Sequence, residues 1–442
     1  MHEVEGPKGY IATPGFYGTP TKVLRPLSSY ERLIKAIDEA VGFNFSVAFT
    51  FSGAIEEKRW NQAFVELQQR HPLLNAWIEN GEPQSPAFVR GECRKVAIQF
   101  AQRNSPAQWQ RVTESQLAEP FDRSIAPLLR VNLLHDNDGF DLILTANHIV
   151  LDGMGMIRLV RDLLAVLSGE KLTSLPIPVP ADELVVSKRS LQDTLADSPR
   201  ASEEALRELA ALRPGTIRRR EGGGAPVMDA MRFTEEETAL LMSCARKEQA
   251  TMGSVLLAAI VRAMQIVPGP LENARIRFAA PIDMRPDLGN ANDFVLSMAM
   301  ARGASPPLEL GLWESARWIG ARLRSFRSLI EFEAAFQGVE QLLSMNLPSA
   351  ATVDALAARG GHDVMLSNLG SIDLPQAAAE GISLQAVWGP SVLVGYEGEH
   401  TVGSATWNGA LHLVYTSHSP LRRLLEGARR VLMEGCTAGA KA

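Results

Sequence analysis

Strand-like and helix-like segments alternate along this chain on both sides of a proline- and glycine-rich stretch, and this alternation restricts the fold more than any other feature. Residues 44–53 alternate polar and apolar side chains as a half-buried strand does, and residues 56–70 carry apolar side chains at helical spacing. Beyond the stretch, residues 228–233 resemble a strand, and residues 234–237 (TEEE) open a helix with a capping-box pattern. We therefore predict an α/β (α+β) protein.

The length of 442 residues exceeds what one ordinary core accommodates and predicts two domains. We expect lobes at residues 1–175 and 227–442, joined by a connection at 176–226, with mixed, mostly antiparallel sheets and flanking helices. Further strands are predicted at 75–79, 86–90, 96–100, 127–134, 141–147, 275–281, 296–302, 363–368, 392–397, 400–407 and 410–417. Further helices are predicted at 107–118, 154–169, 252–266, 310–327, 331–346 and 419–434.

Charge and hydropathy exclude several classes of protein. The net charge is −6, and mixed acids and bases leave no basic stripe for nucleic acid or an anionic membrane. The longest apolar stretch, 255–267, is interrupted by Arg262 and is shorter than the roughly 20 residues of a membrane span. The N-terminus lacks the pattern of a secretory signal, so a cytoplasmic location is expected. Cys93, Cys244 and Cys436 form neither a disulfide framework nor a metal motif.

The stretch ANHIVLDGMGM (146–156) places His148 at the end of a strand and before an apolar helix. A neutral imidazole, with an ordinary pKa of about 6.5, can accept a proton from an incoming hydroxyl or amine. Asp152 either holds that ring in position or is only the N-cap of the helix. Gly153 permits a tight turn or the close approach of a substrate. From spacing alone, His148 is also consistent with a routine strand-end histidine.

Three other chemistries fit this stretch poorly. Gly153 and Gly155 imitate a dinucleotide fingerprint, but the third glycine position holds Arg158. No second ligand cluster lies near His148, which argues against a metal site. The chain has no GxSxG elbow and no cysteine in a recognisable reactive setting, so a covalent nucleophile is unsupported. A one-step transfer with His148 as base is left.

Six segments in order resemble the condensation-domain superfamily, the coenzyme-A-dependent acyltransferases related to chloramphenicol acetyltransferase. NHIVLDG (147–153) resembles the HHxxxDG signature of that family. The other segments are RPLSSYERLIKAID (25–38), RHPLLNAWI (70–78), EPFDRSIAPLLRVNLL (119–134), APIDMRP (280–286) and LSNLGSIDLP (366–375). The resemblance spans residues 25–434 and includes polyketide-associated and alcohol O-acyltransferases.

The resemblance implies two chloramphenicol-acetyltransferase-like lobes around a tunnel that opens at both faces, where acyl donor and acceptor meet. It makes His148 the general base, Asp152 a structural aspartate with Arg285 as its partner, and Asn368 a donor near the developing oxyanion. The Asn368 segment is equally consistent with a simple turn. No bound cofactor is implied, because the donor substrate is an acyl-CoA or a phosphopantetheinyl carrier thioester.

One position departs from the family pattern, since Asn147 replaces the first histidine of HHxxxDG. The second histidine keeps its spacing to Asp152, so we expect base chemistry with altered local hydrogen bonding. No adenylation or carrier segment accompanies the motifs, which predicts a freestanding, monomeric enzyme. His71 is interpreted as a structural residue. The methionines at 154, 156, 298, 300 and 365 are interpreted as core residues, with the wall of an adaptable apolar tunnel as the alternative.

Three functions are open at this stage. The first is an O-acyltransferase that moves an acyl group from a thioester to an alcohol, in natural-product or lipid biosynthesis. The second is a condensation enzyme that forms an amide from a carrier-bound thioester, and the third is a non-catalytic docking module for a synthase partner. The sequence identifies neither the acyl chain nor the acceptor.

Overall fold

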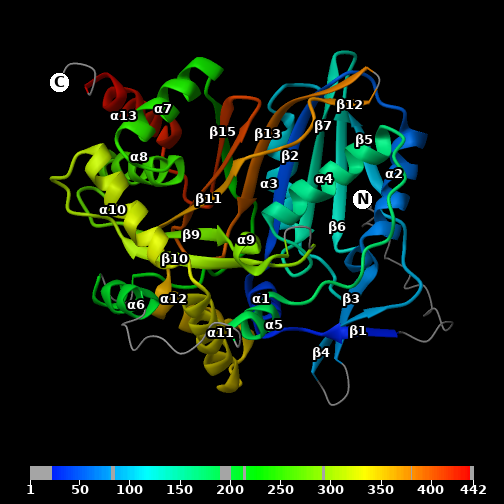
Figure 1. Cartoon of the computed structure of the whole chain (residues 1–442), viewed down its shortest axis with the longest axis horizontal. Coiled ribbons are helices and arrows are strands. Elements are labelled where there is room, and N and C mark those ends of the chain that lie inside the picture. The colour runs from blue at the N-terminus through cyan, green and yellow to red at the C-terminus, as the bar shows by residue number, and fades with distance from the viewer. Residues whose placement is uncertain are drawn as a thin grey trace, which may run out of the picture.

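The computed structural model describes residues 22–80, 85–189, 201–212, 216–290, 294–379 and 381–438. The N-terminal stretch, where no secretory signal is predicted, lies outside the described residues, as do 190–200 and 213–215 of the predicted connection. Within the described ranges, two six-stranded sheets stand side by side and define two lobes (Figure 1). A three-stranded sheet, β1 (Lys22–Pro26), β4 (Pro86–Arg90) and β3 (Ala76–Asn80), lies beside the first lobe.

The first sheet has the order β12-β13-β2-β7-β6-β5 and is antiparallel except between β5 and β6. Its strands are β12 (Ala377–Ala379), β13 (Ile382–Val392), β2 (Asn44–Ser52), β7 (Gly139–Asn147), β6 (Leu129–His135) and β5 (Ile98–Gln102). Strand β7 is buried along its whole length, which its nearly continuous apolar sequence accounts for. It ends one residue before His148.

The second sheet has the order β10-β9-β11-β14-β15-β8, with β11 parallel to both of its neighbours. Its strands are β10 (Met298–Ala304), β9 (Arg277–Asp283), β11 (Val364–Ser371), β14 (His400–Trp407), β15 (Ala410–Ser417) and β8 (Val227–Arg232). The other pairs in this sheet are antiparallel. The prediction of mixed, mostly antiparallel sheets with flanking helices is confirmed.

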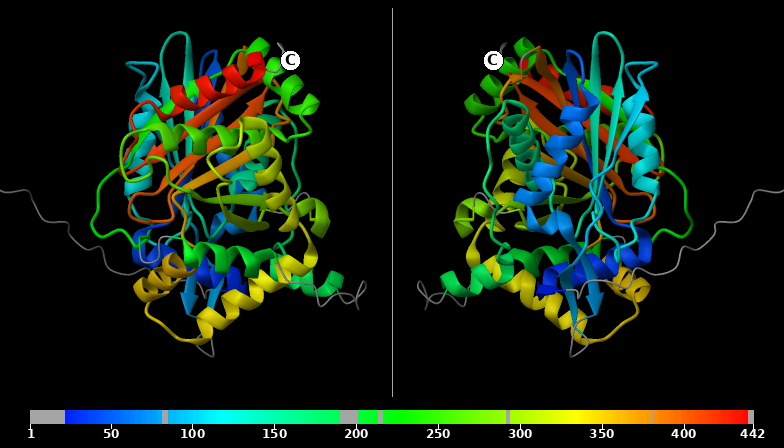
Figure 2. Two further views of the ribbon diagram at one scale, coloured as in Figure 1. Left: turned by 90° about the vertical axis from the view of Figure 1, so that its left-hand side faces the viewer. Right: turned by 90° about the vertical axis from the view of Figure 1, so that its right-hand side faces the viewer.

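Helices lie over the outer face of each sheet, and further helices pack between the sheets or against one another (Figure 2). The first lobe carries α1 (Ser29–Val41), α2 (Glu57–Arg70), the short η1 (Pro72–Asn75), α3 (Gln108–Ala118) and α4 (Gly153–Leu167). The second carries α7 (Glu235–Lys247), α8 (Met252–Ile266), α9 (Arg285–Leu288), α10 (Leu312–Ser325), α11 (Leu329–Ser344), α12 (Ser349–Gly360) and α13 (Leu424–Ala438). Helix α7 starts with the predicted capping box, in which Thr234 and Glu237 each accept from the other's backbone.

The predicted connection at 176–226 carries α5 (Ala181–Arg189) and α6 (Ala201–Ala211). Helix α5 packs against α9 and α11, and α6 packs against β10 and α12. Both helices therefore lie on the second lobe. In the described residues no single helix is long and apolar enough to cross a membrane, and α7 and α8 meet that description only as a pair bent by 101°.

The predicted strand at 392–397 is wrong, because β13 occupies residues 382–392 and the chain after Val392 is a loop. Gly389-Pro390 interrupts the strand pattern of β13 in the sequence, and a proline argues against a central strand. Strand β13 nevertheless pairs with β2 of the first sheet and also contacts β14 and β15. Residues 377–392, from the C-terminal half of the chain, thus complete the first sheet. No single position in the sequence separates the residues of one sheet from those of the other.

Strands β13 and β14 approach each other closely at Gly403. A methyl group added there would collide with the carbonyl oxygen of Pro390, which is backbone and cannot rotate away. We expect Gly403→Ala to lower the free energy of unfolding by about 1–3 kcal/mol, as overpacking does. Urea denaturation measures this change.

The control is Gly338→Ala in α11, where an added methyl group meets no atom within 4 Å. This substitution should raise helix stability by up to about 1 kcal/mol. A Gly403→Ala protein as stable as the parent chain would show that β13 and β14 do not approach this closely.

Candidate functional site

His148 lies in the turn between β7 and α4, where aromatic rings hold it. Its backbone N–H donates to the carbonyl oxygen of Phe43 at 2.9 Å. The imidazole stacks on the Phe43 ring, with centroids 4.8 Å apart and an interplanar angle of 15°, and contacts the Phe45 ring at 4.6 Å. Only 7% of the residue is exposed. The ring orientation is therefore determined by packing.

Burial also determines the charge of His148. Desolvation lowers the pKa of the imidazole below 6.5, and the nearby carboxylate of Asp152 offsets only part of this effect. The buried Nδ1 has no hydrogen-bond partner in the described part of the chain. The ring is therefore neutral near pH 7, and Nε2 is the nitrogen that is available to the cavity beside it.

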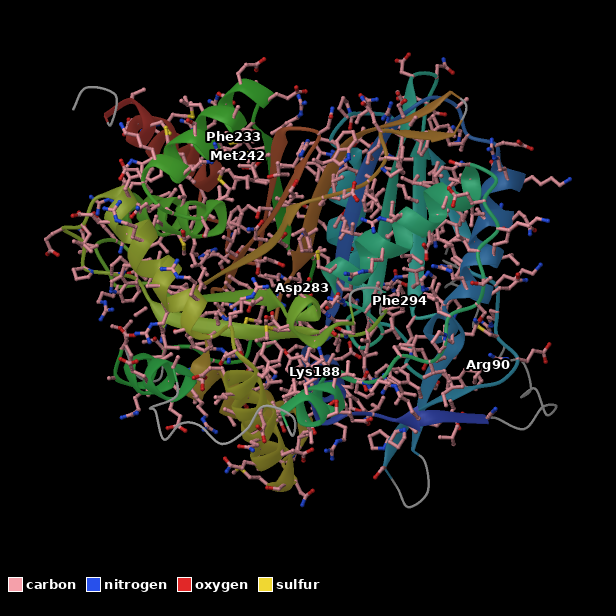
Figure 3. The ribbon with its side chains drawn as sticks, viewed as in Figure 1. Arg90, Lys188, Phe233, Met242, Asp283 and Phe294 are labelled. Atoms are coloured by element: carbon pink, nitrogen blue, oxygen red, sulfur yellow. The ribbon has the colours of Figure 1, made fainter. Side chains whose placement is uncertain are left out.

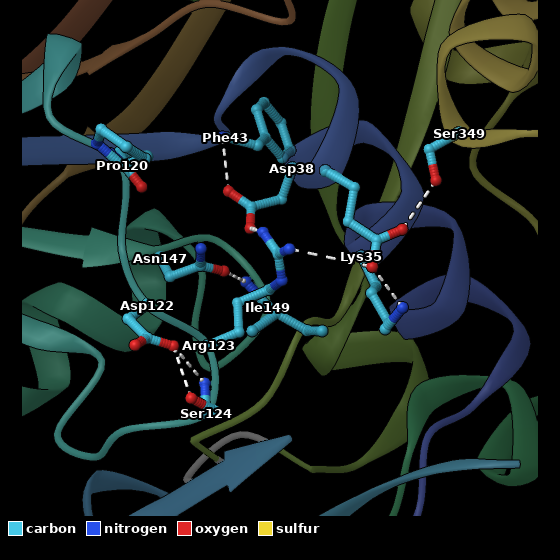
Figure 4. Close-up of polar contacts among 12 residues, drawn as sticks. Lys35, Asp38, Phe43, Pro120, Asp122, Arg123, Ser124, Asn147, Ile149 and Ser349 are labelled. Atoms are coloured by element: carbon cyan, nitrogen blue, oxygen red, sulfur yellow. Dashed lines mark hydrogen bonds and ion pairs between the residues drawn. The ribbon is translucent and has the colours of Figure 1, made fainter. Parts of the chain in front are cut away.

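Phe43, the platform under His148, is itself held by charged groups. The Asp38 carboxylate at the end of α1 accepts the backbone N–H of Phe43 at 2.7 Å and also pairs with Arg123 (Figure 4). Asn147, fully buried, accepts the backbone N–H of Ile149 at 3.1 Å and so closes the turn around His148 (Figure 4). These contacts fix the turn from both sides.

Asp152 connects three separate segments through its carboxylate. Oδ1 accepts from the backbone N–H of Gly155 at 2.8 Å, which makes Asp152 the N-cap of α4. Oδ1 also accepts from Nη2 of Arg285 at 2.8 Å, and Oδ2 accepts from the backbone N–H of Ser297 at 3.1 Å. Burial by itself raises the pKa of this carboxyl, but Arg285 and the N–H donors outweigh it and hold the pKa below the usual value.

Arg285 is the predicted partner of Asp152 and comes from the second lobe. It is 1% exposed, and Nη1 also donates to Asp283 at 3.0 Å while Nη2 donates to the carbonyl oxygen of Val295. Figure 3 shows Asp283 near the middle of the molecule, between the two sheets. The ion pair therefore ties the turn after β7 to the opposite lobe.

Gly153 allows the lobes to approach each other at the start of α4. A methyl group there would lie 2.8 Å from Cδ2 of Leu369 and 3.5 Å from Cγ of Pro390, both from the C-terminal half. Gly153 thus lets side chains of the C-terminal half pack against the start of α4, and the close approach of a substrate there stays a prediction.

Asn368 lies in β11 with an exposed side chain. Its Oδ1 accepts from the backbone N–H of Gly370 and from Oγ of Ser404, both at 2.9 Å. The segment is a strand whose pairing with β14 is irregular between Asn368 and Ser371, not a simple turn, and the Nδ2 group of Asn368 is left as the donor. Nδ2 faces the start of α8, since a methyl group added at Gly253 would lie 2.9 Å from it.

A small cavity at the junction of the lobes brings these side chains together. Of the predicted site residues, it is lined by His148, Asp152, Gly153, Arg285 and Asn368, but not by Asn147. No group of three or more potential metal ligands occurs among the described residues. A passage that opens at both faces stays a prediction.

Sequence reasoning missed part of the cavity wall. Met154, Met298, Met300 and Met365 line the cavity, which is the alternative to core packing for these methionines, while Met365 also belongs to the hydrophobic core, as Met156 does. Phe43 and Phe45 were not predicted, since an aromatic strand residue has no signal that separates it from core. His71 is a structural residue, because its Nε2 lies 2.8 Å from Asp162 and it does not line the cavity.

A family model of the condensation domain matches residues 33–287, which is more than half of the chain. The chain belongs to the condensation-domain family. Gramicidin S synthase 2 from Aneurinibacillus migulanus is 30% identical over 159 residues, which are 34% of this chain and 4% of that synthase. The chain thus matches only a small part of the length of its curated relatives.

Solved structures share the fold over most of its length. The first condensation domain of the CDA synthetase has a TM-score of 0.69 at 13% identity, covering 93% of this chain and 96% of that domain. TRI3 trichothecene 15-O-acetyltransferase from Fusarium sporotrichioides has a TM-score of 0.65 at 13% identity, with 95% of each chain covered. Peptide synthetase domains and an acetyltransferase therefore share this two-lobed architecture.

The buried ion pair can be tested by Arg285→Met, which leaves the Asp152 carboxylate buried without its cation. We expect the free energy of unfolding to fall by about 3–5 kcal/mol, the cost of breaking a buried pair from one side. Urea unfolding followed by tryptophan fluorescence measures it.

Arg161→Met is the matched control, because Arg161 and its partner Asp373 are both exposed. Its unfolding midpoint should stay close to that of the parent chain. Similar losses in the two variants would contradict a special role for the buried pair.

Proposed function

We propose that this condensation-family chain is an acyltransferase that moves an acyl group from a thioester to an alcohol. The observation that carries the proposal is a neutral, packed imidazole that borders a cavity between the lobes, with an amide donor on the same cavity wall. The acyl donor is an acyl-CoA or a phosphopantetheinyl carrier thioester, and the chain holds no cofactor of its own.

In the proposed reaction, Nε2 of His148 accepts the proton of the alcohol while the alcohol oxygen attacks the thioester carbonyl. The tetrahedral oxyanion accepts a hydrogen bond from Nδ2 of Asn368, whose Oδ1 is occupied by Gly370 and Ser404. Collapse breaks the carbon–sulfur bond, and the imidazolium of His148 returns the proton to the departing thiolate. General-base action contributes about 10²–10⁴-fold, and one oxyanion donor contributes about 10²–10³-fold.

Asp152 and Arg285 act as positioning residues in this scheme. The carboxylate of Asp152 is saturated by Arg285 and two backbone N–H groups, and this supports a structural role. Asn147 takes part in the turn through Ile149, so the base is retained although the family's first histidine is replaced.

The acceptor class separates the two enzymatic candidates. The fold shared with an O-acetyltransferase favours an alcohol. The 30% identity to a peptide synthase favours an amine as the second candidate, with a carrier-bound thioester and amide formation. We also propose that the enzyme is cytoplasmic and monomeric and acts in natural-product or lipid biosynthesis. The alternative, a non-catalytic docking module, is addressed by the test below.

The central test replaces the base by His148→Ala and His148→Gln. With a panel of acyl thioesters and alcohols, kcat/KM for thiol release should fall by about 10²–10⁴-fold. Mass spectrometry of the product distinguishes ester from amide.

His135→Gln, at the opposite end of the β6–β7 hairpin, is the control and should retain full activity. Folding of all variants is compared by circular dichroism. Unchanged turnover in a folded His148→Ala protein would exclude base catalysis, and no turnover by the parent chain with any thioester would favour the docking module.

The pH dependence follows from the lowered pKa of His148. A base must be deprotonated, so a lower pKa moves the acid limb of kcat/KM to lower pH. We expect kcat/KM to be level in the neutral range and the midpoint of its acid limb to lie below pH 6.5, the ordinary pKa of histidine. Thiol release, corrected for spontaneous thioester hydrolysis, measures the profile, and an acid limb centred above pH 6.5 would contradict the assignment.

A further inference from the structure

A second, larger cavity adjoins the candidate site. The two cavities share Phe43, Met298, Met300 and Val394 as wall residues. Helices α1, α11 and α12 supply a mainly apolar wall, formed among others by Leu33, Ile34, Ile37, Phe336, Leu342 and Leu356. Because Phe43 also stacks on His148, a molecule in the second cavity reaches the imidazole past that ring.

Strand β10 carries a cation into this apolar cavity. Met298, Met300 and Arg302 alternate along one face of β10, and the two methionines line both cavities, whereas Arg302 lines only the second. Arg302 lies four residues after Met298 in β10, which corresponds to about 13 Å along an extended strand.

Arg302 has neither a hydrogen bond nor an ion pair in the described part of the chain, and its Nε is buried without a partner. Arg285, in contrast, is paired with two carboxylates. Of the acidic residues on the same wall, Glu331 accepts the backbone N–H groups of Ala201 and Ser202, and Glu203 is exposed on α6. Arg302 is only partly buried, and its guanidinium, which lacks a counter-ion among the described residues, favours an anionic ligand in this cavity.

Further hydrogen-bond donors line the same cavity. The hydroxyl groups of Tyr30 and Tyr396 can donate, and His362, which is 4% exposed, has no partner for Nε2 among the described residues. Burial, with a smaller effect from Arg302, lowers the pKa of His362 to about 3, so this ring is neutral. The uncharged donors of Tyr30, Tyr396 and His362 thus line the same cavity as Arg302.

We propose that the second cavity binds the acyl acceptor, an amphipathic alcohol whose apolar chain lies along α1 and α11 and whose carboxylate pairs with Arg302. The inference rests on the proposed function and adds the class of acceptor to it. A guanidinium pairs with a carboxylate through two parallel hydrogen bonds, and Arg359, exposed on α12, is a second cation on the cavity wall.

The test compares 12-hydroxydodecanoate with dodecane-1,12-diol, two probes of the same chain length that differ in the carboxylate. Isothermal titration calorimetry on the full chain measures both. We expect the hydroxy acid to bind about 10- to 100-fold more tightly, the effect of a hydrogen-bonded charge. Arg302→Gln should reduce this preference to within about twofold, and Arg302→Lys should retain part of it.

Arg246→Gln, an exposed arginine on α7 outside the cavity, is the matched control and should keep the full preference. Equal binding of the two probes, binding of neither, or an undiminished preference in Arg302→Gln would overturn the proposal. Calorimetry needs no turnover, so a carboxylate preference that depends on Arg302 in a chain without transferase activity would reject the proposed function and retain the carboxylate site.

Discussion

The buried ion pair between Asp152 and Arg285 is the interaction on which the candidate site depends. It places one carboxylate at the junction of α4, α9 and the segment before β10, and two backbone N–H groups complete its hydrogen bonding. A charge pair in such a position is tolerated only when nearly every polar atom has a partner. The turn that carries His148 is thereby held against the opposite lobe.

Interlocked sheets support the same junction. Strand β13 leaves the C-terminal half to pair with β2, and Gly403 and Gly153 allow backbone and side chains from the two lobes to approach closely. The walls of the cavity therefore come from both halves of the chain. A cavity built in this way keeps its shape only while both sheets stay in register, which suits a site where two substrates must meet.

The electrostatics of the junction separate three roles. The carboxylate of Asp152 keeps its charge because Arg285 compensates for burial, and the imidazole of His148 stays neutral because desolvation exceeds the attraction of that carboxylate. Arg302 is a cation without a counter-ion in the described residues. The paired charges of Asp152 and Arg285 thus hold the lobes together. The neutral ring of His148 suits the proposed proton transfer, and the charge of Arg302 suits the proposed binding of an anionic ligand.

The sequence by itself determined what depends on neighbours within a few residues. The bounds of α8, the capping box of α7, the β6–β7 hairpin and the place of His148 between strand and helix follow from periodicity and local hydrogen bonds. The ordered motifs also identified the family and the pairing of Asp152 with Arg285. Only the tertiary structure decided that β13 crosses to the first sheet, that methionines line the cavity, and that Arg302 lacks a counter-ion. These features depend on which distant segments lie side by side, and local sequence patterns carry no information on that.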